Sequence, residues 1–165
     1  VPRTYYQPIP SPDLTPAPEQ LPDNTYVKAH LPLFIADQSD LSSTRLADSL
    51  VQEARIYQEL AKHPHPNICE YRGVCIQDGL ISGICLRRYS KTLQKCVDDG
   101  DSLDVESVIQ GIDAGLEHLH KLEYVHGDIN PSNIMFDAKD FSLPVIIDFD
   151  SCYRDGTEIT DKGGT

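Results

Sequence analysis

The chain has 165 residues, of which 24% are charged and 39% hydrophobic, and its formal net charge is −12. This length fits one domain with a substantial core. The chain contains no stretch of eighteen apolar residues, so no membrane span is predicted. The acidic excess falls in residues 98–165, which carry sixteen acidic and four basic side chains against ten of each in residues 1–97. This distribution disfavours a basic-patch nucleic-acid binder, so neither nucleic acid nor a membrane is an expected partner.

The N-terminal segment, residues 1–24, is rich in proline. Seven of the twelve prolines fall within residues 1–22, and no glycine occurs before Gly73. No apolar run follows the first residues, which argues against a signal peptide. We expect the segment to be extended and to form a flexible tail. A ligand for a partner protein and a strap laid over the domain are the two alternatives.

A strand and a helix are predicted next. The strand covers residues 25–30, and a polar loop follows over residues 36–44. The helix begins near Ser43 or Thr44 and ends by His63-Pro64, where proline stops it. Its apolar residues recur with a period close to 3.6, and they are Leu46, Leu50, Val51, Ala54, Tyr57, Leu60 and Ala61.

The middle of the chain predicts a hairpin and two further helices. Residues 71–76 and 80–86 read as strands, because Asp78-Gly79 between apolar runs is a strong hairpin signal. A short helix is expected over residues 92–97. A longer one follows a cap at Ser102 or Asp104. Its apolar face consists of Val105, Val108, Ile109, Ile112, Leu116 and Leu119.

The last third holds a polar loop around His126, a hairpin around residues 137–142 and a strand that leads into Asp148. Residues 151–165 form a polar tail. The five cysteines are odd in number and include no C-x-x-C pair, so we expect neither a zinc site nor a disulfide framework. A reducing compartment, cytosolic or nuclear, is the expected location. Cys75 and Cys85 lie in apolar strand-like runs and are expected to be small core residues.

The spacing H-x-D-x-x-x-x-N, from His126 to Asn133, carries the chemistry. Asp128 can accept or orient a hydroxyl proton, and Asn133 lies five residues on, where a tight loop can turn its amide oxygen towards the same pocket. Asp148, after a short hairpin, can hold Mg²⁺ against ATP phosphates. Either motif alone could be a polar turn, since Asp and Asn are common turn residues. Together with the apolar strand before Asp148 they indicate phosphoryl transfer.

The order of these features resembles the eukaryotic protein kinase fold, and in particular the degenerate kinase-like domains abundant in fungi. The resemblance covers residues 25–165. It implies an α+β fold with a reduced N-lobe sheet and one helix in residues 25–89, which end in the hinge. Residues 90–165 then form a partial helical C-lobe with the catalytic loop and activation segment. The implied ligands are ATP and Mg²⁺, and the implied partner is a protein substrate or another protein.

The resemblance also assigns roles to individual residues. It implies that Asp128 is the catalytic base, that Asn130 stands at a second catalytic position, and that Lys28 contacts ATP phosphates. The implied partner of Lys28 is Glu53 on the following helix. The hinge that borders adenine matches residues 86–89, so the remaining implied nucleotide contacts are Leu86 and Tyr89, and the implied metal ligands are Asn133 and Asp148.

Four departures from the family pattern weaken the expectation that this chain binds ATP and transfers a phosphoryl group. No glycine precedes Lys28, so the glycine-rich loop that covers phosphates is missing, and Tyr26 stands where kinases keep a small residue. Gly127 and Asn130 replace the usual arginine and lysine of the catalytic loop, and the metal motif ends in Asp150 instead of glycine. The chain ends at Thr165, so the helix over residues 104–120 loses part of its cover. The proline-rich segment, a second copy of the chain or a partner are candidates to replace it.

Three functions stay open on this basis. The first is an ATP- and Mg²⁺-dependent phosphotransferase towards Ser/Thr hydroxyls, weak or degenerate. The second is a pseudokinase that acts as a binding or scaffold module. The third is a small-molecule kinase, because His126-Gly127-Asp128 with Asn133 also resembles the loop of aminoglycoside and choline phosphotransferases.

Overall fold

The computed structural model describes residues 3–29, 45–137 and 140–156. The polar loop expected over residues 36–44, the proposed helix start at Ser43 or Thr44, and the tail from residue 157 on lie outside these ranges. The described elements are η1 (Arg3–Tyr5), β1 (Thr25–Lys28), α1 (Arg45–Ala61), β2 (Tyr71–Gln77), β3 (Leu80–Arg87), β4 (Lys91–Thr92), α2 (Leu93–Asp99), α3 (Val105–Lys121), β5 (Tyr124–Val125), η4 (Pro131–Asn133), β6 (Ile134–Asp137), β7 (Asp140–Ile146) and β8 (Tyr153–Arg154). None of the helices in these ranges is long and apolar enough to cross a membrane.

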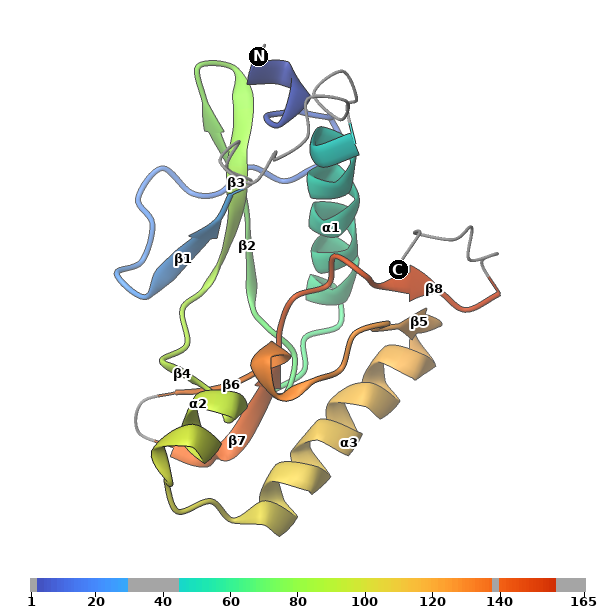
Figure 1. Cartoon of the computed structure of the whole chain (residues 1–165). Coiled ribbons are helices and arrows are strands. Elements are labelled where there is room, and N and C mark those ends of the chain that lie inside the picture. The colour runs from blue at the N-terminus through green and yellow to red at the C-terminus, as the bar shows by residue number, and fades with distance from the viewer. Residues whose placement is uncertain (1–2, 30–44, 138–139, 157–165) are drawn as a thin grey trace.

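The N-terminal lobe is a three-stranded antiparallel sheet in the order β1-β3-β2, with α1 packed along one face (Figure 1). The turn between β2 and β3 is the predicted one, and Asp78 and Gly79 both adopt positive φ angles, 53° and 76°. Two consecutive positive φ angles match the twist of a two-residue hairpin. The side of α1 that faces the sheet is buried at the predicted positions Leu50, Ala54, Tyr57 and Leu60.

A disulfide joins Cys75 on β2 to Cys85 on β3, so the expectation of two free core cysteines is wrong. The pairing depends on a shift in strand register between Cys75 and Ile76, which places Cys75 opposite Gly83 and Cys85 opposite Gly73. The two cysteines are therefore diagonal neighbours, with their Cα atoms 6.3 Å apart, within the range a disulfide spans. The other three cysteines are free and buried.

Residues 3–24 are packed against the N-lobe, so the tail expectation is wrong and the strap alternative is right. We call these residues the N-terminal strap. Leu14 is buried in the same core cluster as Leu50 and Val74. Val74 donates its N–H to Thr15 O at 3.0 Å and accepts from Ala17 N at 2.9 Å, which forms a parallel bridge on the free edge of β2.

Gly73 makes this close approach possible. Its φ is +106°, and a Cβ built there would lie 2.6 Å from the backbone nitrogen of Ala17. Any larger residue would push the strap away from β2. The prolines of the strap lack N–H groups but still accept hydrogen bonds, as Pro8 O does from Ile81 N at 2.8 Å. A proline-rich composition therefore does not prevent a segment from packing along a sheet.

The C-terminal lobe contains α2, α3 and two small sheets, β4-β6-β7 and β5-β8. Asp104 caps α3 by accepting from Ser107 N at 3.2 Å, which is one of the two predicted caps. Within α3, Val108 and Leu119 are buried, but Val105 and Ile109 are 64% and 53% exposed. The predicted apolar face is thus covered only in part.

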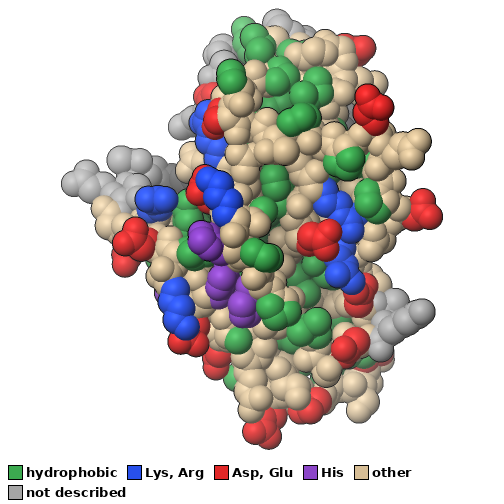
Figure 2. Space-filling model, turned by 180° about the vertical axis from the view of Figure 1, so that it is seen from behind, with side chains coloured by type: hydrophobic (Ala, Val, Ile, Leu, Met, Phe, Trp, Pro, Cys, Tyr) green, Lys and Arg blue, Asp and Glu red, His purple; other side chains and the backbone are tan. Residues whose placement is uncertain are grey.

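The two lobes are joined by the loop after α1. Asn67 donates its side-chain amide to Pro144 O at 2.7 Å, and backbone bonds link residues 67 and 69 to Ile146 on β7. On the far face of the molecule, His65 stacks on His118 of α3, and histidine side chains gather there (Figure 2). Figure 2 also shows acidic side chains over the end of the molecule that holds the C-lobe, as the charge distribution predicts. The predicted α+β class, with a small N-terminal sheet and one helix followed by a more helical part, is confirmed.

Candidate active site

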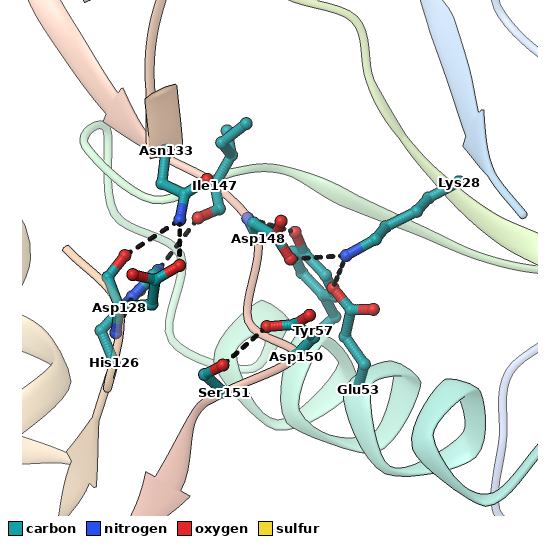
Figure 3. Close-up of polar contacts among 10 residues, drawn as sticks. All are labelled: Lys28, Glu53, Tyr57, His126, Asp128, Asn133, Ile147, Asp148, Asp150 and Ser151. Atoms are coloured by element: carbon teal, nitrogen blue, oxygen red, sulfur yellow. Dashed lines mark hydrogen bonds and ion pairs between the residues drawn. The ribbon is translucent and has the colours of Figure 1, made fainter. Parts of the chain in front are cut away.

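Lys28 connects both lobes through its ammonium group. Its Nζ lies 2.7 Å from Glu53 Oε1 on α1 and 2.5 Å from Asp148 Oδ1 just after β7 (Figure 3). The pairing predicted between Lys28 and Glu53 is therefore present. Tyr26, two residues earlier on β1, keeps 51% of its surface exposed and does not fill a closed pocket.

Burial and charge act against each other within this cluster. Burial raises the pKa of Glu53, although the Lys28 ammonium group lowers it in part. Burial also opposes the charge on Lys28, but Glu53 and Asp148 outweigh it, and the pKa of Lys28 lies above its ordinary value. Lys28 therefore stays protonated at neutral pH. The side chain of Glu53 is fully buried, and its Oε2 has no hydrogen-bond partner within the described residues.

The catalytic-loop residues converge on Asp128. Asn133 donates its amide to Asp128 Oδ2 at 3.0 Å and to the Asp128 carbonyl at 2.9 Å, and Asn130 donates to Asp128 Oδ1 at 3.0 Å. The side-chain oxygen of Asn130 accepts from Ser132 N at 2.9 Å and caps η4. Asp128 is exposed, so a substrate hydroxyl can reach its carboxylate.

His126 stabilises the catalytic loop through both nitrogens of its ring. Its Nε2 donates to Ile147 O at 2.9 Å, and its Nδ1 accepts from Asp128 N at 3.3 Å. Its ring also packs edge-on against Phe149, with the centroids 5.0 Å apart. Burial lowers the pKa of His126, so the ring stays neutral at neutral pH. This geometry supports a structural role.

Gly127 lies against the segment after Phe149. Gly127 has φ +81°, and a Cβ there would collide with the carbonyl oxygen of Ser151. Backbone atoms of Ser151 occupy the space that a side chain at position 127 would need. Asp150, where the family has glycine, is exposed and accepts from Ser151 Oγ at 2.9 Å.

Tyr57 is a site residue that sequence reasoning assigned only to the core. Its hydroxyl accepts the backbone N–H of Asp148 at 3.2 Å, while its ring packs edge-on against Phe149. Asp148 has a positive φ of 64°, an uncommon conformation for a residue other than glycine. Tyr57 thus holds Asp148 in the conformation that faces Lys28. Its place in the apolar period of the helix gave no signal of this contact.

The two predicted metal ligands offer oxygen atoms. Asn133 binds Asp128 through its amide nitrogen, and its Oδ1 has no hydrogen-bond partner within the described residues. Asp148 contacts Lys28 through Oδ1. Carboxylate and amide oxygens suit Mg²⁺, which is commonly bound by one or two protein groups together with substrate phosphates. The described ranges contain no group of three or more His, Cys, Asp or Glu side chains placed to bind a metal. The donor set therefore fits magnesium delivered with a nucleotide.

The two predicted hinge contacts, Leu86 and Tyr89, lie in different surroundings. Leu86 is buried in the main core and pairs with Tyr26, whereas the Tyr89 side chain lines a cavity of about 410 Å³ on the other side of the hinge. The Tyr89 hydroxyl accepts from Glu70 N at 3.4 Å. Within the described residues the backbone N–H of Tyr89 has no hydrogen-bond partner. Neither Lys28 nor Asp128 lines this rear cavity, which is separate from the cluster in Figure 3.

No pair of strands precedes β1 in the described part of the N-lobe. The residues before it form η1 and the N-terminal strap, with Asn24 O accepting from Arg88 N at 2.7 Å. The prediction that the glycine-rich loop is missing agrees with this arrangement.

Comparison with known proteins adds the family. A model of the protein kinase domain matches residues 34–162. Over 111 residues the chain is 33% identical to the human serine/threonine-protein kinase/endoribonuclease IRE2, which covers 62% of this chain and 12% of that protein. It is also similar to calcium and calcium/calmodulin-dependent serine/threonine-protein kinases of Lotus japonicus, 28% identical over 68% of this chain and 22% of that protein, and of Oryza sativa subsp. japonica, 32% identical over 62% and 20%.

The chain therefore spans less than a quarter of the length of each of these relatives. The family match begins six residues after Lys28, so the role of that lysine rests on its contacts with Glu53 and Asp148 alone. The match includes α1, the hinge, the catalytic loop and Asp148. With this coverage and this geometry, the chain belongs to the protein kinase domain family.

Proposed function

We propose that this chain is the nucleotide-binding and catalytic part of an ATP- and Mg²⁺-dependent protein kinase that acts on Ser/Thr hydroxyls. The observation that carries the proposal is the position of Lys28 between Glu53 and Asp148, because this contact brings strand, helix and metal-binding carboxylate to one point. The names of the relatives, all serine/threonine-protein kinases, favour a protein hydroxyl over a small molecule as acceptor.

Each residue of the site would have its own role in phosphoryl transfer. Lys28 would exchange its contact with Asp148 for the ATP phosphates, while Glu53 continues to hold it. Magnesium bound by Asp148 and the Asn133 amide oxygen would neutralise phosphate charge. Asp128, held by two amides, would orient the acceptor hydroxyl and take its proton as the oxygen attacks the terminal phosphorus. The bond from that phosphorus to the bridging oxygen would break, and ADP would leave. The backbone N–H of Tyr89, which has no partner within the described residues, would donate to adenine.

A pseudokinase that binds its ligand without turnover is the second candidate. Asn130 favours it, because this residue supplies no charge and its amide is already committed to Asp128 and to the cap of η4. The usual lysine at this position would neutralise the transferred phosphoryl group. Nucleotide binding without measurable transfer is the outcome that this alternative predicts.

Nucleotide binding is the first test. Calorimetric titration with ATP and Mg²⁺ should show binding, and Lys28→Met should weaken it by roughly 10- to 100-fold, because a charge-assisted contact is lost. Lys62→Met is the matched control, since within the described residues Lys62 pairs with exposed Glu59 on the surface. Absence of binding by the unmodified chain at millimolar ATP would refute the nucleotide part of the proposal.

Phosphoryl transfer is the second test. Radiolabelled ATP and a Ser/Thr peptide library should show incorporation that Asp128→Asn reduces by roughly 10²- to 10⁴-fold with nucleotide affinity unchanged. If the unmodified chain binds ATP but the peptides gain no label above the Asp128→Asn background, the pseudokinase alternative replaces the kinase proposal.

A further inference from the structure

The N-terminal strap contacts one flank of α1 through Gln58. Gln58 Nε2 donates to Asp13 O at 2.5 Å, and Gln58 Oε1 accepts from Thr15 N at 2.7 Å. A single side chain therefore binds the strap backbone on both sides of Leu14. Figure 1 shows the strap, in blue, passing from α1 across the sheet to β1.

The same strap residues are bonded to β2. Thr15 O accepts from Val74 N, and Ala17 N donates to Val74 O. Gln58 lies five residues after Glu53 on α1, so the two side chains point about 140° apart around the helix axis. The strap thus fixes one flank of α1 to the sheet, and Lys28 holds Glu53 on the other flank.

The strap contacts differ in how much they stabilise its attachment to the N-lobe. The ion pair of Asp13 with Arg55, at 2.8 Å, has both side chains 52% exposed, and exposed pairs contribute little. Hydrogen bonds from Arg55 lower the pKa of Asp13, but water screens this exposed pair. Leu14 is buried in the core, and the two Gln58 bonds and two Val74 bonds are directional. The strap is held by burial and by the bonds to its backbone.

Glu53 supplies the reason why α1 must be held. Its carboxylate is buried, one oxygen has no partner within the described residues, and a buried unsatisfied oxygen would gain hydrogen bonds by moving to water. The contact with Lys28 offsets this cost only while α1 stays against the sheet. Rotation or outward movement of α1 would release Glu53 and leave Lys28 with Asp148 alone.

We propose that the N-terminal strap is a built-in positioning segment for α1, and that Gln58 is the positioning residue through which it keeps Glu53 against Lys28. The inference rests on the proposed function, because it concerns the lysine–glutamate pair of that site. Detachment of the strap lowers the fraction of molecules with the pair formed, and attachment raises it.

Gln58→Ala tests the coupling, with Gln52→Ala as its control, because Gln52 is exposed on the same helix and makes no strap contact. Hydrogen exchange at Thr15, Ala17 and Val74 should accelerate by roughly tenfold in Gln58→Ala, since two hydrogen bonds are lost. The reaction of Lys28 with acetic anhydride, followed by mass spectrometry, should rise several-fold against Lys62 in the same sample. Gln52→Ala should change neither rate.

A second pair of variants detaches the strap from the other side. Gly73→Ala places a Cβ against the backbone of Ala17, whereas Gly79→Ala also adds a Cβ at a positive φ, +76°, but with no atom within 4 Å of it. Gly73→Ala should accelerate exchange at Ala17 and raise Lys28 acylation, and Gly79→Ala should do neither. If a variant does not fold, the other pair still decides.

Faster strap exchange with unchanged Lys28 acylation would refute the inference, because the strap would then be a structural cover without effect on the site. Acylation requires no nucleotide, so it reports on the inference even if the chain fails to bind ATP. Where ATP does bind, its affinity should fall in Gln58→Ala and not in Gln52→Ala. Failure of the proposed function and failure of the inference are thereby separated.

Discussion

At the scale of single residues, the site has more acidic than basic groups. Lys28 is shared by Glu53 and Asp148, and Asp150 adds negative charge that raises the pKa of Glu53 further. One ammonium group cannot balance these carboxylates, so a cation would relieve their repulsion. This excess explains why a polyanionic nucleotide is expected to arrive with magnesium and not alone.

His126 gives the site a defined dependence on pH. Its folded-state pKa is lowered by burial below the ordinary value of 6.5, so the unfolded chain binds the proton more readily. The free energy of unfolding should therefore be fully supported above pH 6.5 and fall as the pH drops below it. Urea unfolding from pH 8 to pH 5 should show a steeper decline for the unmodified protein than for His126→Phe.

His65, whose pKa burial also lowers, is present in both proteins and cancels in this comparison. Parallel declines in the two proteins would show that the folded chain protonates His126 as readily as the unfolded chain does. Such a result would contradict the bond from Asp128 N to Nδ1, which requires an unprotonated nitrogen.

The sequence was most informative where a side chain acts within a short local loop. Asp128 and Asn133 could be placed in one pocket because five residues of a tight loop separate them. Tyr57 could not be assigned, because its contact with Asp148 spans 91 residues and its position looked like ordinary core. The roles of Asp128, Asn130, Asn133 and Asp148 in transfer stay predictions.

At the scale of elements, the hairpin of β2 and β3 was predicted with its turn, but its disulfide was not. The Asp78-Gly79 signal fixes the turn locally. The disulfide depends on the register shift after Cys75, and no sequence pattern indicates such a shift. The strap was only an alternative to a flexible tail for a related reason, because its bonds to Val74 need the positive φ of Gly73, far along the chain.

The disulfide should stabilise the N-lobe by a measurable amount. Cys75 and Cys85 are separated by 10 residues, and closing a loop of this length contributes roughly 2–3 kcal/mol in the chain-entropy model. Reductant should therefore lower the midpoint of urea unfolding, and the double variant Cys75→Ala, Cys85→Ala should not respond. Thiol titration of the denatured, unreduced protein should find three thiols, and a count of five would contradict the bond.

At the scale of the whole molecule, α3 has one covered face and one open face. Leu119 is fully buried, so Leu119→Ala should lower the free energy of unfolding by roughly 2–5 kcal/mol. Ile109 is 53% exposed, and Ile109→Ala should cost less than about 0.5 kcal/mol. Chemical denaturation at two protein concentrations measures both.

A larger cost for Ile109→Ala that grows with protein concentration would show that a second copy covers α3. Light scattering on the same samples would then report a mass above that of one chain. A homo-oligomer formed through this face is a proposal that these two measurements decide together.

The bridge between the strap and Val74 has a consequence for solubility. β2 is the outer strand of its sheet, and its unpaired amide and carbonyl groups would offer a template for strands of other molecules. Thr15 and Ala17 occupy the outward groups of Val74, in a segment whose prolines cannot extend the ladder further. The strap therefore covers the edge of the sheet at Val74. Its loss would expose unpaired backbone groups of β2, through which strands of other molecules could pair and the protein could aggregate.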